Sequence, residues 1–175
     1  MQQNFRKLMF VCAGNTSRSP MAEAIFRSLF RSSGPHCMID DPKTRVMVEV
    51  SSSGVVAWGD EPYSTYAVTV SRLKYGEDLS SGYSKIAIYE RLCTQDLILC
   101  VEEGLADYLR TKHKRLADRI FSLQGLLDKY RIDAIDGEVV DPHGKDSTAY
   151  FETAEQIDMI LRALMPEILK EWGMK

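Results

Sequence analysis

The chain of 175 residues is 45% hydrophobic and 27% charged, with a formal net charge of −3, a composition typical of one globular domain over residues 1–175. The slight acidity excludes the basic surface of a nucleic-acid-binding protein. No apolar run reaches about 18 residues, and the first residues lack the apolar stretch and cleavage site of a signal peptide. We therefore expect no membrane partner and a cytoplasmic location.

The four cysteines indicate free thiols rather than a metal site. Cys12, Cys37, Cys93 and Cys100 form no C-x-x-C pair, and only three histidines are present, so a structural zinc site is not expected. An even number of cysteines is compatible with two disulfides, but the reducing cytoplasm favours free thiols. We expect no metal and no cofactor, and at least one cysteine is free for chemistry.

The first part of the chain predicts a strand, a loop and a helix. Residues 7–11 read K-L-M-F-V, an apolar run typical of a buried strand. Residues typical of a loop follow at 12–17. Ser19 and Pro20 then mark the start of a helix, which is expected to end before Gly34. Apolar residues recur at helical spacing after Pro20, so this helix is expected to pack on a sheet.

Further elements alternate along the rest of the chain. They are a strand at 47–53, a loop at 58–62, a helix at 63–75 that ends at Gly76, a helix at 84–92, a strand at 96–101, a helix at 102–112, a strand at 119–123, a loop at 132–145 and a long helix at 148–172. Strands that alternate with helices predict an α/β fold in three layers, a four-stranded parallel sheet with helices on both faces. Such folds place their sites at the carboxyl ends of strands, where Cys12 is expected.

The segment after the first strand has the residues of an anion-binding loop that carries a nucleophile. Between Cys12 and Arg18 lie Ala13, Gly14, Asn15, Thr16 and Ser17. A loop of this length can curl so that its backbone N–H groups bind an anion, and the following helix N-terminus adds its dipole. Arg18 supplies a planar fork for two phosphate oxygens. These surroundings, with a hydrogen bond from Ser19, favour a thiolate on Cys12 that attacks phosphorus.

The spacing alone also fits a buried cysteine followed by a surface arginine, but the strand, the loop and the Ser-Pro helix start favour the chemical interpretation. The segment F-V-C-A-G-N-T-S-R-S-P-M-A-E-A resembles the signature of the low-molecular-weight protein tyrosine phosphatases. The resemblance continues in Ser52-Ser53-Gly54, the strand at 96–101 and Asp141-Pro142. It implies a hydrolase without a cofactor, which dephosphorylates phosphotyrosine in a protein partner through a phosphocysteine and releases inorganic phosphate.

The same resemblance gives roles to three residues outside the loop. Asp141 is implied to be the general acid and then the base, although an Asp-Pro pair is also an ordinary turn. Ser52 is implied to hydrogen-bond the loop near Asn15; the alternative is a strand-end serine that satisfies local backbone. Trp58 is implied to form a wall of the substrate pocket, and the alternative is a partly buried core tryptophan.

The chain departs from the family pattern at positions that affect substrate choice. Thr16 stands where the tyrosine phosphatases usually have an aliphatic residue, and the bacterial protein-arginine phosphatase branch resembles this chain in having threonine there. Phosphoarginine is therefore an alternative to phosphotyrosine, unless Thr16 only fills space. His143 stands where an aromatic residue often follows Asp-Pro; it either stacks on the substrate or is a solvated loop residue. The connection at 35–45 is longer than usual, and we assign it no function.

Other functions fit the residues less well. Arsenate reductases of this fold shuttle a disulfide between two cysteines with the spacing of Cys93 and Cys100. The partner of Cys100 is expected downstream, however, where Asp107 stands, and a strand separates Cys93 from Cys100 by more than a disulfide spans. A phosphate-binding protein without activity needs neither a nucleophile nor an acid. The phosphate-binding motifs of nucleotide-binding proteins are missing.

Overall fold

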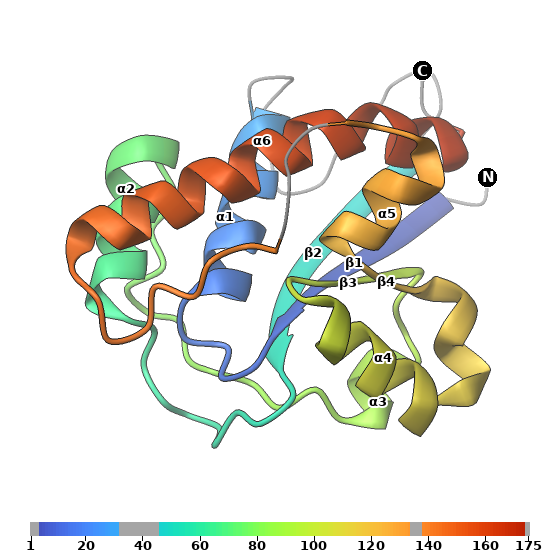
Figure 1. Cartoon of the computed structure of the whole chain (residues 1–175), viewed down its shortest axis with the longest axis horizontal. Helices are drawn as coiled ribbons and strands as arrows, with labels where there is room; N and C mark the ends of the chain where they lie inside the picture. Colours follow the sequence, from blue (N-terminus) through green and yellow to red (C-terminus); the bar gives the residue numbers. More distant parts are fainter. Residues whose placement is uncertain (1–3, 32–45, 134–137, 174–175) are drawn as a thin grey trace.

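A parallel four-stranded sheet forms the centre of the fold (Figure 1). The computed structural model describes residues 4–31, 46–133 and 138–173. Strand β1 (Asn4–Cys12) lies between β2 (Val46–Gly54) and β3 (Leu97–Cys100), and β4 (Ile120–Ser122) pairs with β3, which gives the order β2-β1-β3-β4. The predicted fold class and the four predicted strands are confirmed.

The helices that connect these strands mostly lie where the sequence predicts them. The described helices are α1 (Arg18–Arg31), α2 (Thr65–Tyr75), α3 (Tyr89–Leu92), α4 (Glu103–Lys112), α5 (Leu123–Tyr130) and α6 (Ser147–Glu171), with a 3₁₀-helix at Lys114–Arg119. α2 ends as predicted because Gly76 adopts a left-handed conformation (φ 69°) and its N–H caps the last turn. In the described ranges, no helix combines the length and apolarity needed to cross a bilayer. Cys37 and the connection at 35–45 lie outside the described residues.

Helices cover both faces of the sheet, which accounts for the uninterrupted apolar run in β1. Leu8 and Phe10 belong to the core that the sheet forms with α1, α5 and α6. Met9 and Val11, which point to the opposite face, pack with residues of α3 and α4. All four side chains are buried, as expected for a strand covered on both faces.

One helix prediction needs correction, and one helix was not predicted. The helix predicted at 84–92 is reduced to α3, because the chain before it forms isolated bridges, Gly54 with Ile86 and Pro62 with Tyr83. These bridges hold the segment in an extended conformation. α5 was not predicted; it follows β4 directly, and its N-cap Ser122 accepts a hydrogen bond of 2.8 Å from the backbone N–H of Gly125.

The close approach of β2 to β1 fixes the loop that follows Cys12. Cys12 is in register with Gly54, and a Cβ on Gly54 would lie 2.5 Å from the carbonyl oxygen of Ala13. Only glycine allows this approach. Beyond Gly54, the backbone N–H groups of Val55 and Val56 donate to the carbonyls of Cys12 and Ala13, each over 3.0 Å. The loop therefore begins as an extension of the sheet.

Candidate active site

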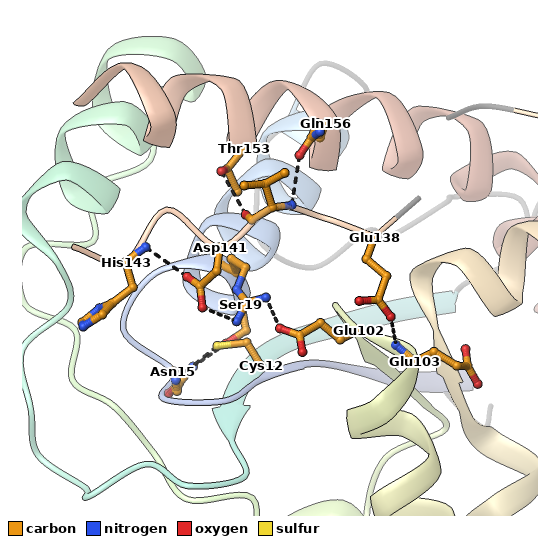
Figure 2. Close-up of polar contacts among 12 residues, drawn as sticks. Cys12, Asn15, Ser19, Glu102, Glu103, Glu138, Asp141, His143, Thr153 and Gln156 are labelled. Atoms are coloured by element: carbon orange, nitrogen blue, oxygen red, sulfur yellow. Dashed lines mark hydrogen bonds and ion pairs between the residues drawn. The ribbon is translucent and has the colours of Figure 1, made fainter. Parts of the chain in front are cut away.

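The Cys12 thiol lies buried at the base of the loop, surrounded by hydrogen-bond donors (Figure 2). The backbone N–H of Asn15 donates to Cys12 Sγ over 3.2 Å, and the Ser19 hydroxyl lies 3.0 Å from the same sulfur atom. Asn15 reaches this position through a left-handed conformation (φ 55°), which asparagine tolerates better than most residues. Both donors are therefore aimed at the sulfur atom.

Asn15 also ties the loop to its neighbours, through partners that the sequence did not predict. Its amide NH₂ donates to Ser19 Oγ over 2.9 Å, and its amide oxygen accepts from the backbone N–H of Lys85 over 2.8 Å. The predicted hydrogen bond from Ser52 to the loop near Asn15 is not found, because the buried Ser52 Oγ makes no hydrogen bond to any described loop residue. Ser53, the residue after Ser52, supports the site instead, because its carbonyl oxygen lies 3.3 Å from Ser19 Oγ.

Arg18 is buried between two carboxylates. Its side chain is only 4% exposed, and the interpretation as a surface arginine is wrong. One terminal nitrogen pairs with Glu102 and the other donates to Asp141 Oδ2 over 2.6 Å (Figure 2). Sequence reasoning missed Glu102, although a carboxylate two residues after the end of β3 lies at the same sheet edge as the loop after β1. A buried guanidinium needs such a partner.

Asp141 reaches the loop from the segment before α6, and α6 holds that segment. The backbone N–H of Val140 donates to Gln156 Oε1 over 3.2 Å, and its carbonyl accepts from the hydroxyl of the buried Thr153 over 3.1 Å (Figure 2). Asp141 Oδ1 accepts from the backbone N–H of His143 over 3.0 Å. These contacts fix the backbone on both sides of Asp141, so its carboxylate faces Arg18.

If Asp141 is the general acid that the family resemblance implies, Thr153→Val is expected to weaken the reaction, because Thr153 holds the segment before Asp141. The substitution removes one hydrogen bond at nearly constant volume, and a net loss of about 1 kcal/mol in acid positioning corresponds to a roughly fivefold fall in kcat/KM. The fall should be clear with phenyl phosphate, whose leaving group needs a proton, and smaller with 4-nitrophenyl phosphate. The matched control is Thr69→Val, which removes a similar threonine–carbonyl hydrogen bond on α2. Equal losses with both substrates would contradict a positioning role.

Cys12, Arg18 and Asp141 line a single cavity of about 340 Å³ together with the predicted pocket residues. Its lining consists of Cys12, Ala13, Gly14, Thr16, Ser17, Arg18, Val56, Trp58, Glu61, Asp141 and His143. Trp58 is 90% exposed, so the interpretation as a core tryptophan is wrong. Asn15, Ser19 and Ser52 do not line the cavity. Asn15 and Ser19 instead hold the loop through their hydrogen bonds to each other and to Cys12 Sγ. Glu61 was not predicted from the sequence.

A buried tyrosine connects the loop to α2 and α6. The hydroxyl of Tyr150 on α6 lies 3.3 Å from Ser17 Oγ, and Ser64 Oγ donates to it over 2.9 Å. The backbone N–H of Ser64 in turn donates to the carbonyl of Thr16 over 2.9 Å. The sequence did not reveal Tyr150, because it lies far from the loop along the chain.

The remaining described cysteines are not arranged for a redox shuttle. Cys100 is fully buried in β3, and burial raises the pKa of its thiol. Cys93 is half-buried near α3, where its sulfur contacts the carbonyl of Glu90 at 3.6 Å. Cys12, Cys93 and Cys100 are all free thiols. Within the described ranges, no three His, Cys, Asp or Glu side chains gather in a group that could hold a metal ion.

Comparison with known proteins identifies the family of this chain. The family model for low molecular weight phosphotyrosine protein phosphatase matches residues 7–173. The chain belongs to this family. Its relatives are named as protein phosphatases, so the protein is a phosphatase and hence a hydrolase.

Relatives of this phosphatase fall into two groups by name. A protein-arginine-phosphatase from Bacillus subtilis (strain 168) is 28% identical over 165 residues, which are 94% of this chain and 97% of the relative. A low molecular weight protein tyrosine phosphatase from T. tengcongensis is 31% identical in its crystal structure, with a TM-score of 0.78 and coverage of 93% of this chain and 99% of that chain. A YwlE arginine phosphatase mutant with a phosphorylated active-site serine is 27% identical, with a TM-score of 0.75 and coverage of 94% and 96%. Sequence identity and structural similarity therefore do not distinguish a phosphotyrosine substrate from a phosphoarginine substrate.

Proposed function

We propose that this protein dephosphorylates proteins through a phosphocysteine intermediate on Cys12. One observation carries the proposal: the Cys12 thiol, the Arg18 guanidinium and the Asp141 carboxyl group line the same cavity. In the first step, Cys12 Sγ attacks phosphorus, and the bond from phosphorus to the substrate side chain breaks. Asp141 gives its proton to the departing atom, which leaves as a neutral group.

The second step returns the enzyme to its starting state. Asp141, now a carboxylate, takes a proton from the water that attacks the phosphocysteine. The phosphorus–sulfur bond breaks, inorganic phosphate leaves, and the thiolate is again stabilised by Asn15 N–H and Ser19. Arg18 and the backbone N–H groups of the loop bind the phosphoryl oxygens in both steps. This chemistry needs a reduced Cys12 and no metal or cofactor, which fits a single domain in the reducing cytoplasm.

Phosphotyrosine and phosphoarginine are the two candidate substrates. The rings of Trp58 and His143 in the cavity lining favour a phenyl ring, which they can contact face to face. Thr16 and Glu61 in the same lining favour phosphoarginine, because their oxygen atoms can accept hydrogen bonds from its guanidinium group. The relative named protein-arginine-phosphatase supports this second candidate. Phosphotyrosine remains the first, since the matching family is named for it.

Matched peptides that differ only in the phosphorylated residue decide between the two substrates. We expect Thr16→Ile to shift the ratio of kcat/KM by about tenfold toward phosphotyrosine, because it removes one hydrogen-bond acceptor and adds apolar surface. If wild-type protein prefers phosphotyrosine and the variant has the same ratio, Thr16 only fills space and phosphoarginine is the wrong substrate. A wild-type protein that hydrolyses neither peptide contradicts the proposed function.

A further inference from the structure

A second cavity of about 610 Å³ adjoins the catalytic one. The two share Thr16, Glu61 and His143 in their linings. The remaining lining comes from two segments. Pro62, Ser64, Thr65 and Tyr66 lie at the start of α2, and Gly144, Lys145 and Tyr150 lie at the start of α6. These ends of α2 and α6 lie on the same side of the molecule (Figure 1). A substrate chain whose phosphorylated side chain enters the catalytic cavity therefore has a second hollow beside it.

An aromatic platform forms part of this second cavity. Tyr66 is 43% exposed, and its ring packs against the Tyr150 ring, with centroids 5.4 Å apart and planes tilted by 57°. Tyr150 is itself buried and fixed through its hydroxyl by Ser17 and Ser64. The exposed face of Tyr66 thus rests on a rigid support, which lowers the entropy cost of packing a ligand against it.

The charges around the cavity do not select an acidic or a basic ligand. Glu61 and Lys145 are the carboxylate and the ammonium group in its lining, and both are exposed. Their opposite signs cancel in the potential that a charged side chain would meet, and exposed single charges contribute little. The aromatic surface of Tyr66 is therefore the feature with the largest effect on binding.

We propose that this second cavity binds a large apolar side chain next to the phosphorylated residue of the protein substrate. This inference rests on the proposed function and adds a sequence preference to it. Neighbouring residues of an extended peptide are about 3.3 Å apart, so a side chain one or two positions from the phosphorylated residue reaches a cavity that shares three residues with the catalytic one. Packing on Tyr66 removes apolar surface from water and strengthens binding before the chemical step.

The test compares phosphopeptides with phenylalanine or alanine on either side of the phosphorylated residue, in phosphotyrosine and phosphoarginine versions. We expect the phenylalanine peptide to have a kcat/KM about tenfold higher than the alanine peptide, mostly through KM. Tyr66→Ala should remove this preference and leave hydrolysis of 4-nitrophenyl phosphate unchanged. Tyr108→Ala is the matched control, because Tyr108 on α4 is 46% exposed and lines neither cavity.

The possible failures are distinguishable. If wild-type protein hydrolyses both peptides equally well, or Tyr66→Ala keeps the preference, the second cavity is not a substrate site and the proposed function stands. A preference lost equally in Tyr108→Ala also overturns the assignment to this cavity. If wild-type protein hydrolyses 4-nitrophenyl phosphate but none of the phosphopeptides, the proposed function fails and the substrate site fails with it.

Discussion

Cys12→Ser is expected to abolish turnover, with a fall in kcat of about 10⁴-fold or more. The serine hydroxyl would occupy the position of Sγ between the same donors, Asn15 N–H and Ser19 Oγ. It is nevertheless a weaker nucleophile than a thiolate, because its pKa is far higher. Any phosphate that serine accepts is released slowly, since an alkoxide is a poorer leaving group than a thiolate. Substrate should therefore leave a phosphoserine at position 12.

Intact mass spectrometry after incubation with substrate measures this outcome, as one added phosphoryl group that peptide mapping assigns to position 12. The related YwlE arginine phosphatase mutant carries such a phosphorylated active-site serine. Cys93→Ser is the control, since Cys93 is half-buried and lies outside the cavity lining. It should keep wild-type kcat. Substantial turnover by Cys12→Ser would refute the phosphocysteine mechanism.

The parts of the site that the sequence predicted are those encoded locally. The apolar run of β1 and the Ser-Pro start of α1 lie next to the loop itself, so strand, loop and helix could be placed together. The spacing of Cys12 and Arg18 then indicated a shared anion site, and both residues line the same cavity. Local patterns suffice here because one continuous segment builds most of the nucleophile loop.

Contacts between distant segments were the parts that the sequence did not predict. Glu102 contacts Arg18 from the segment after β3, and Tyr150 contacts Ser17 from α6. The periodicity of a helix indicates its apolar face, but it does not indicate which distant residue a given side chain contacts. The role of Ser52 followed from the family resemblance, which indicates a position in the chain but not the contact that its side chain makes. The carbonyl of Ser53 contacts Ser19, an interaction that no side-chain pattern reveals.

Asp141→Asn is expected to lower kcat/KM with phenyl phosphate by about 10²–10³-fold and to have a much smaller effect with 4-nitrophenyl phosphate. Asparagine has the same size, but its amide oxygen can accept only one of the two bonds that Asp141 accepts on separate oxygens, from Arg18 on Oδ2 and from the backbone N–H of His143 on Oδ1. It has no proton to give to the departing oxygen. Phenol has a pKa of about 10, so phenolate leaves poorly without that proton. The 4-nitrophenolate that leaves from 4-nitrophenyl phosphate is stabilised by its nitro group and needs no proton.

The dependence of the rate on the leaving group separates an acid from a carboxylate that only orients Arg18. If Asp141 only held the guanidinium, Asp141→Asn would weaken phosphate binding and lower kcat/KM by the same factor for every aryl phosphate. A series of aryl phosphates with increasingly acidic phenols therefore distinguishes the two roles by slope. The control is Asp118→Asn, because Asp118 is 82% exposed at its side chain and lines neither cavity. A steeper slope only in Asp141→Asn identifies the proton donor, since loss of proton transfer makes the rate depend more strongly on the basicity of the departing atom.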